Sequence, residues 1–134
     1  MPVPANDSST LEVIREHVRT GLPHLSGAAA SELIRVAEIL VKEFEPIRLY
    51  VFGSHARGTG NGHSDIDLFV EVGTLSAMPH QLAQRAFALI GRHDVPLDLV
   101  FMSTEDVAWR LDVPGSLPAT VIREGHPIYD ATAA

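Results

Sequence analysis

Two acidic residues, Asp65 and Asp67, at the start of the apolar run DIDLFVEV constrain this chain most. The run is typical of a strand, in which side chains two positions apart leave the same face roughly 6.5–7 Å apart. Two carboxylates on one face repel each other unless a cation lies between them. Ile66, Leu68 and Val70 alternate with the acidic residues and can fill a core on the opposite face. The pattern therefore predicts a divalent-metal site on one side of an anchored strand.

A second apolar run, Leu49 to Phe52, precedes the acidic pair and is typical of a buried strand. Gly53 follows this run and lets a backbone approach a ligand closely. If a short helix begins at Ser54, its free N–H groups and positive dipole end favour phosphate. An anion site that faces a dicarboxylate metal site is what transfer from a metal-bound nucleoside triphosphate requires.

The spacing of these residues resembles that of a known family. Gly53-Ser54, ten residues and then Asp65-x-Asp67 match the G-S-x(10)-D-x-D signature of the DNA polymerase β-like nucleotidyltransferase superfamily. The strings GSHARG and SDIDL resemble those of minimal nucleotidyltransferase (MNT) domains of the antitoxin type. The resemblance covers roughly residues 30–130. It implies an α/β fold with a short mixed β-sheet flanked by helices, packed mainly on one face.

The resemblance also implies roles for the residues of the glycine-rich segment. Gly53 and Ser54 would hold the β- and γ-phosphates of ATP, with Arg57 and Ser64 in the same nucleotide site. Arg57 matches the arginine of the family string, and it either contacts the triphosphate or braces the loop through a carboxylate. The loop Thr59-Gly60-Asn61-Gly62 departs from the family, which often has a charged residue there, so nucleotide selectivity stays open.

A third carboxylate, Asp98, lies inside the apolar run from Val95 to Met102. A lone charge in such a run is costly to desolvate. An edge strand that reaches water would remove this cost, and Pro96 permits an edge position. The family resemblance implies instead that Asp98 lies beside Asp65 and Asp67 and shares their metal. The three would then bind two Mg²⁺ ions, or Mn²⁺ in their place, and Asp98 would help to deprotonate the acceptor.

Helical periodicity accounts for much of the remaining chain. A helix after the cap Ser26 is expected to reach Phe44, and a second to span residues 80–91. Shorter helices are expected over Thr10–Thr20, from Ser103 and over Pro118–Glu124, with a closing strand in REGHPIYD. The inward residues of the two longer helices are predicted to be Leu33, Val36, Ala37, Leu40, Val41 and Phe44, and Leu82, Ala83, Ala86, Leu89 and Ile90. We expect a tail and short helix in residues 1–26 and the nucleotidyltransferase domain in residues 27–134.

Three aromatic side chains invite a functional role that the pattern does not favour. His55 and His63 flank the glycine-rich segment, but Mg²⁺ prefers oxygen ligands and the pair has no ligand spacing, so surface positions are expected. Trp109 falls off the stripe made by Val107 and Leu111. Contact with a partner is conceivable for Trp109, and ordinary partial burial is expected.

Composition limits the partners of the chain. The formal charge is −7, with 17 acidic and 10 basic residues, and the basic residues are scattered. This argues against broad nucleic-acid binding, which depends on clustered Lys and Arg. No apolar run approaches the ~20 residues that span a bilayer, and the N-terminus lacks a signal-peptide pattern. A cytoplasmic protein that binds no membrane is therefore expected.

Two classes of function remain open. The first is a metal-dependent nucleotidyltransferase that transfers AMP from ATP to a hydroxyl acceptor. The acceptor would be a partner protein, because the family includes antitoxins paired with HEPN-type ribonuclease toxins; a homo-oligomer also stays open. Antibiotic nucleotidyltransferases are a related alternative, although they carry a second helical domain for the drug. The second class is a module that binds a nucleotide or a partner without catalysis.

Overall fold

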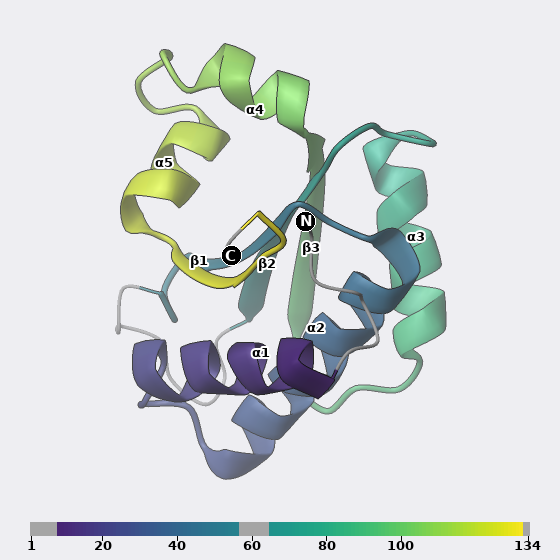
Figure 1. The fold of residues 1–134 in the computed structure, drawn as a ribbon, viewed down its shortest axis with the longest axis vertical. Helices are drawn as coiled ribbons and strands as arrows, with labels where there is room; N and C mark the ends of the chain where they lie inside the picture. Colours follow the sequence, from purple (N-terminus) through teal and green to yellow (C-terminus); the bar gives the residue numbers. More distant parts are fainter. Residues whose placement is uncertain (1–7, 57–64, 133–134) are drawn as a thin grey trace.

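The computed structural model describes residues 8–56 and 65–132, which form a four-stranded sheet with helices on both faces (Figure 1). The elements in chain order are α1 (Ser8–Gly21), α2 (Gly27–Phe44), β1 (Arg48–Phe52), β2 (Ile66–Val72), α3 (Pro79–Ile90), β3 (Leu97–Ser103), α4 (Thr104–Arg110), α5 (Leu117–Glu124) and β4 (His126–Asp130). This arrangement confirms the expected α/β fold with a short mixed sheet flanked by helices.

The strand order in the sheet is β3-β2-β1-β4. β1 is antiparallel to both of its neighbours, β2 and β4. β2 and β3 are parallel, and α3 makes the crossover that such a pair requires. The two edge strands of this sheet are therefore β3 and β4, and β2, which follows Asp65, is an inner strand.

The longest helix, α2, forms where the apolar stripe predicts it. Ser26 caps its start, with the side-chain oxygen accepting a hydrogen bond from the backbone N–H of Ala29 at 3.1 Å. Glu45 ends it in a left-handed conformation, with φ of 47°. The buried residues of α2 are Leu33, Val36, Ala37, Leu40 and Val41, all of them predicted, and the sixth predicted residue, Phe44, is half-buried.

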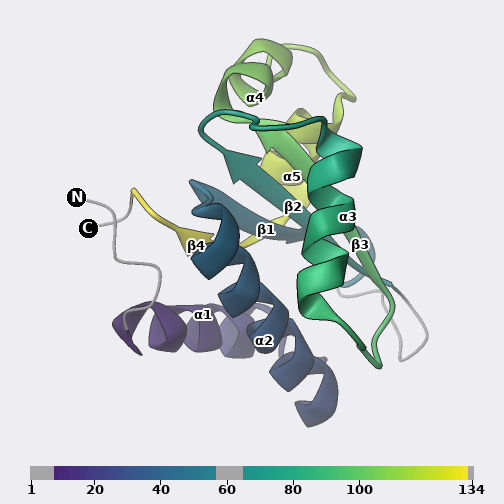
Figure 2. The same cartoon turned by 90° about the vertical axis from the view of Figure 1, so that its right-hand side faces the viewer.

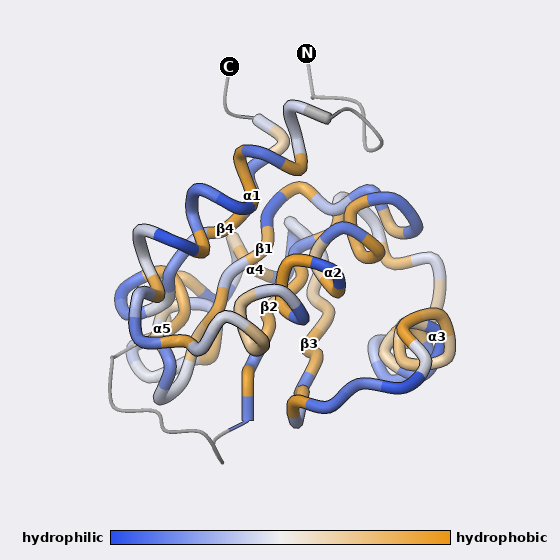
Figure 3. The backbone as a smooth tube through the Cα atoms, turned by 90° about the horizontal axis from the view of Figure 1, so that it is seen from below, coloured by the Kyte–Doolittle hydropathy of each residue, from blue (hydrophilic) through white to orange (hydrophobic). Residues whose placement is uncertain are grey.

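The main core lies between the sheet and the helices α1, α2 and α3. Leu68 and Val70 of β2 are fully buried there, with Leu40 of α2. Figure 2 shows α2 and α3 in front of the strands, and Figure 3 shows β2 and β3 as mainly hydrophobic strands lying side by side. Because β2 contributes alternate residues to this core, the residues between them face the other side of the sheet.

A smaller core covers that other side, under α4 and α5. Phe69 of β2 is buried there with Val107 of α4 and Val121 of α5. Tyr50 and Phe52 of β1 meet the Phe69 ring edge-on, with ring centroids 6.4 and 6.5 Å apart. The helices α4 and α5 therefore cover one end of this face.

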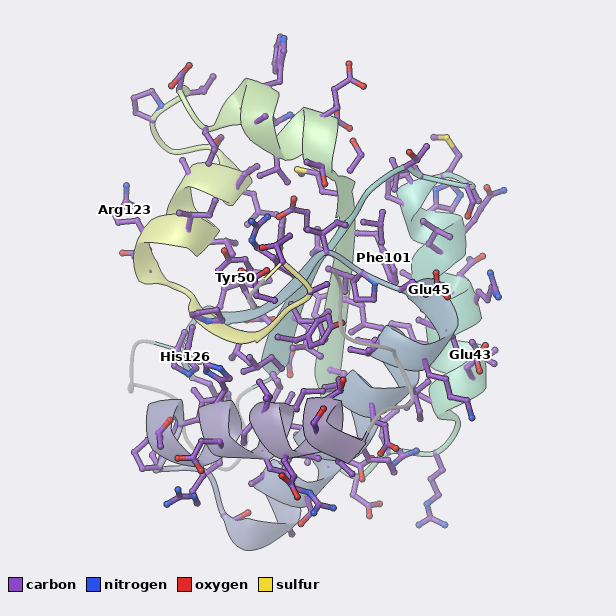
Figure 4. All side chains as sticks on the ribbon, viewed as in Figure 1. Glu43, Glu45, Tyr50, Phe101, Arg123 and His126 are labelled. Carbon is purple, nitrogen blue, oxygen red and sulfur yellow. The ribbon has the colours of Figure 1, made fainter. Side chains whose placement is uncertain are left out.

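The N-terminal helix α1 shares the main core. Ile14, Val18 and Leu22 are almost fully buried in the same cluster as the residues of α2 and the sheet. His126 Nε2 of β4, labelled in Figure 4, donates a hydrogen bond to the carbonyl oxygen of His17 at 2.9 Å. α1 is thus a packed arm, and the division of the chain at residue 26 stays a proposal.

Three predicted burial states are wrong. Leu89 of α3 is 43% exposed, because its side of the helix faces away from the sheet. Trp109 of α4 is 75% exposed where partial burial was expected. His55 is only 4% exposed where a surface position was expected. Among the residues described, no helix combines the length and the apolar character needed to cross a bilayer.

Candidate active site

Three chain segments from distant parts of the sequence meet at one end of the sheet. β1 ends at Phe52, and the Cα of Phe52 is the register partner of Asp67 in β2. On the other side of β2, Asp67 is the register partner of Asp98 in β3. Register partners on neighbouring strands lie about 4.8 Å apart, with side chains on the same face. The structure therefore holds two carboxylates side by side.

Asp65 immediately precedes β2 and is exposed. It lies two positions before Asp67, so a continuation of the strand would place both side chains on one face. Asp67 is half-buried and Asp98 is exposed. The exposure of Asp98 follows from the edge position of β3, and the register places it beside Asp67 as well. Asp98 thus lies both on an edge strand that reaches water and beside Asp67.

Gly53 supports this site in a way that the sequence did not indicate. Its φ is +76°, a conformation that L side chains rarely adopt. A Cβ built on Gly53 would overlap Oδ2 of Asp67. Glycine was expected at position 53 so that a ligand could approach the backbone. It also lets the carboxylate of Asp67, a predicted metal ligand, approach the same backbone.

The turn after Gly53 is only partly described. Residues 54–56 form a turn rather than the first turn of a helix, and Ser54 is half-buried within it. Arg57 and Ser64, both assigned to the predicted nucleotide site, lie outside the described residues, as does His63. The described part of the predicted phosphate site is therefore the pair Gly53 and Ser54.

The donor atoms suit a hard divalent cation, because carboxylate oxygens are the ligands that Mg²⁺ prefers. Asp67 and Asp98 are in position for a shared ion by their register. Within residues 8–56 and 65–132, no group of three or more His, Asp or Glu side chains is arranged to hold a metal ion. The chemistry and placement of Asp67 and Asp98 fit such an ion. In the described residues, Asp65 does not converge with them into a group of three.

A histidine pair lies directly beside this turn. The rings of His55 and His24 are stacked, with centroids 5.4 Å apart and an interplanar angle of 8°. His24 Nε2 and His55 Nδ1 are 3.2 Å apart, so one ring nitrogen donates a hydrogen bond to the other. His24 comes from the connection between α1 and α2. Local sequence carries no signal for this contact, since 31 positions separate the two residues.

Comparison with known proteins agrees with this geometry. A solved structure described as the crystal structure of a toxin-antitoxin with AMP-PNP has a similar fold, with a TM-score of 0.50. The two chains are 21% identical, and the match covers 73% of each. The family model for the nucleotidyltransferase domain matches residues 33–105, a range that includes the turn at Gly53 and all three acidic residues. This chain belongs to the nucleotidyltransferase domain family.

Proposed function

We propose that this chain transfers AMP from ATP to a hydroxyl group on a partner protein. The partner would be a HEPN-type toxin, with this chain as its antitoxin, and the reaction would take place in the cytoplasm. The observation that carries the transferase assignment is the register of Asp67 and Asp98, two carboxylates on one face beside the turn at Gly53.

Each residue has a role in this proposal. Gly53 and Ser54 would bind the β- and γ-phosphates through backbone N–H groups and the Ser54 hydroxyl. Asp65, Asp67 and Asp98 would hold two Mg²⁺ ions, or Mn²⁺ in their place. Metal ions bound there would supply positive charge against the charge that develops on the phosphates during transfer.

The proposed reaction exchanges one bond at the α-phosphorus for another and moves one proton from the acceptor hydroxyl to a carboxylate. The acceptor hydroxyl oxygen attacks the α-phosphorus, and the bond to the oxygen that bridges the α- and β-phosphates breaks. Pyrophosphate leaves with the electron pair of that bond. Asp98, which is exposed at the sheet edge, accepts the proton of the acceptor hydroxyl. Glycine at position 53 leaves room for the Asp67 carboxylate, because a Cβ there would overlap it.

Two observations favour a protein as the acceptor. The first is the fold shared with a toxin-antitoxin protein whose structure contains AMP-PNP, an analogue of ATP. The second is the open position of the acidic residues, since Asp65 and Asp98 are exposed at the end of the sheet. An acceptor carried by another protein can reach such a site without an enclosed pocket.

The test uses the protein encoded by the adjacent reading frame, Mg²⁺ and ATP labelled at the α-phosphate. The expected result is label on the partner, on a hydroxyl such as that of tyrosine, with the mass of an added AMP. Asp67→Ala should bind the partner and leave it unlabelled.

Other outcomes would assign a different function. Neutralisation of the partner by Asp67→Ala as well as by the unaltered protein, with no label on either protein, would establish a non-catalytic binding module. Label on a small molecule alone would establish an enzyme that modifies antibiotics or metabolites.

A further inference from the structure

Exposed apolar side chains gather on one part of this protein. In the described part of the chain, seven large apolar residues are at least 40% exposed. Four of the seven fall within residues 109–122, which run from α4 through the following loop into α5: Trp109, Leu111, Val113 and Ile122. A concentration of this kind is typical of an interaction site, whereas scattered apolar residues need no explanation.

A cavity of about 350 Å³ opens between these helices and the sheet. Its lining includes Leu111, the residue that follows α4, and Ile122 of α5. Two of the four exposed apolar residues therefore lie on its wall. Arg48, Tyr50 and Glu71 line it from the strands. Figure 4 shows Tyr50 between the sheet and the two helices. The cavity therefore has apolar walls and a polar floor.

Among the described residues that line the cavity, the floor holds one acidic residue, Glu71, which is paired with the one basic residue, Arg48. Glu71 is 2% exposed, and Arg48 Nη1 donates hydrogen bonds to both of its carboxylate oxygens at 3.3 Å. Thr104 Oγ1 donates a further hydrogen bond to Glu71 Oε2 at 2.9 Å. Arg48 Nε also contacts Asp130 Oδ2 at 3.2 Å, so two carboxylates share one guanidinium group. Burial raises the pKa of Tyr50, which keeps the phenol neutral beside them.

The charge on the helices and loop around the cavity is negative. α4, the following loop and α5 carry two arginines, Arg110 and Arg123, against four acidic residues: Glu105, Asp106, Asp112 and Glu124. The formal charge of the whole chain is −7. A partner that complements this surface is therefore basic, with apolar side chains for the walls.

The surface also has a suitable position relative to the candidate active site. Asp67 and Glu71 both belong to β2 and lie four positions apart, so their side chains leave the same face about 13 Å apart along the strand. A protein held over α4 and α5 would thus place its neighbouring residues close to the carboxylates.

We propose that the surface formed by Leu111, Ile122 and the cavity beneath them binds a basic amphipathic segment of a partner protein. Apolar side chains of the segment cover Leu111 and Ile122, and its lysine or arginine side chains pair with the acidic residues within residues 104–124. This inference rests on the proposed function, because it names the surface that holds the protein acceptor.

The test measures binding without nucleotide, metal or transfer. Two fluorescein-labelled helical peptides of 14 residues, one of leucine and lysine and one with every lysine replaced by glutamate, are titrated with the protein and followed by anisotropy. The lysine peptide should bind, and the glutamate peptide should bind at least about tenfold more weakly.

Matched variants locate the binding surface. Leu111→Gln with Ile122→Gln should weaken binding of the lysine peptide about tenfold, the loss of one or two anchoring contacts. Leu89→Gln with Met78→Gln removes apolar side chains of similar or greater exposure, 43% and 59%, from α3 and its cap and should leave binding unchanged. Equal binding of the two peptides, or equal losses in the two double variants, would overturn the proposal.

A third variant separates this proposal from the proposed function. Asp67→Asn should bind the lysine peptide as the unaltered protein does, because Asp67 lies outside the cavity. Loss of peptide binding in this variant would contradict the assigned surface. Failure to label any protein would refute the transfer reaction and leave the peptide result intact. Melting curves confirm that each variant is folded.

Discussion

The carboxylate of Asp67 occupies the space beside Gly53 that a Cβ would fill. This contact joins the two halves of the family signature, the glycine turn after β1 and the acidic pair at the start of β2. Gly53 is held with φ of +76°, so both its conformation and its neighbour favour glycine. The position of one predicted metal-binding residue therefore depends on a residue predicted to bind phosphate.

Gly53→Ala should lower stability and remove activity, whereas Gly91→Ala should only lower stability. Both glycines have a positive φ, and an alanine at either costs about 1–3 kcal/mol of backbone strain. Among the residues described, nothing lies within 4 Å of a Cβ at Gly91, while a Cβ at Gly53 displaces the Asp67 carboxylate. A shift of about 1 Å in such a group lowers kcat about 100-fold. Urea unfolding and transfer of labelled AMP measure the two effects, and equal activities in the two variants would contradict this account.

Asp98→Asn should lower kcat by about 100- to 1,000-fold, the loss typical of a group that stabilises developing charge. Stability should change by less than about 0.5 kcal/mol, because Asp98 is exposed. Asp94→Asn is the matched control: Asp94 lies four residues earlier, and its side chain is 90% exposed. Calorimetric titration with Mg²⁺ and ATP should show weaker binding for Asp98→Asn and unchanged binding for Asp94→Asn. The role of Asp98 fails if the two variants behave alike.

His24→Ala should reduce activity through the turn that carries His55. The substitution removes the stacked ring and the 3.2 Å nitrogen–nitrogen contact, and the free energy of unfolding should fall by about 1 kcal/mol. kcat should fall as well, since His55 immediately follows Ser54. His80→Ala, at an exposed position of α3, should change neither quantity. A His24→Ala protein with full activity would show that the histidine pair serves stability alone.

Asp130→Asn should destabilise the protein at neutral pH and not in acid. Burial raises the pKa of Asp130, but hydrogen bonds from Thr132 and the charge of Arg48 outweigh burial and hold it below its usual value of 3.8. A carboxyl with a lowered folded-state pKa stabilises the fold above its unfolded-state pKa, and this contribution is lost as pH falls through the folded-state pKa.

The Asp130 side chain is 36% exposed, so the expected loss at pH 7 is only about 0.5–1 kcal/mol. Urea unfolding at pH 7 and at pH 3 measures it, and the difference from the unaltered protein should shrink at pH 3. Asp94→Asn, whose ion pair with Arg92 is over 90% exposed on the arginine side, should show no such difference. A loss that is constant between the two pH values would assign the effect to packing.

Short-range pattern was sufficient for the secondary structure of this protein. The periodicity of α2 identified five residues that are buried, and Ser26 caps the helix because its hydroxyl satisfies a nearby N–H group. Ser103 caps α4 in the same way, accepting a hydrogen bond from the N–H of Asp106 at 3.1 Å. These features depend on residues within one or two turns of each other, which is why the sequence alone determines them.

The family signature predicted which residues carry the chemistry, since the positions of Gly53, Asp65 and Asp67 could be identified by spacing. The contact between the Gly53 backbone and the Asp67 carboxylate could not, because spacing along the chain does not say which neighbour a backbone will meet. The register that sets Asp98 beside Asp67 could not be identified by spacing either, because it depends on the crossover through α3.

Burial was decided by tertiary structure in the same way. His55 is buried because His24, from a distant segment, stacks on it. Trp109 and Leu89 remain exposed because no other element of the described chain covers their side of α4 or α3. The sequence by itself determined the helices and strands of this protein, and its spacing predicted which groups react. Only the tertiary structure decided which of these groups touch, because contacts between distant segments depend on how the whole chain packs.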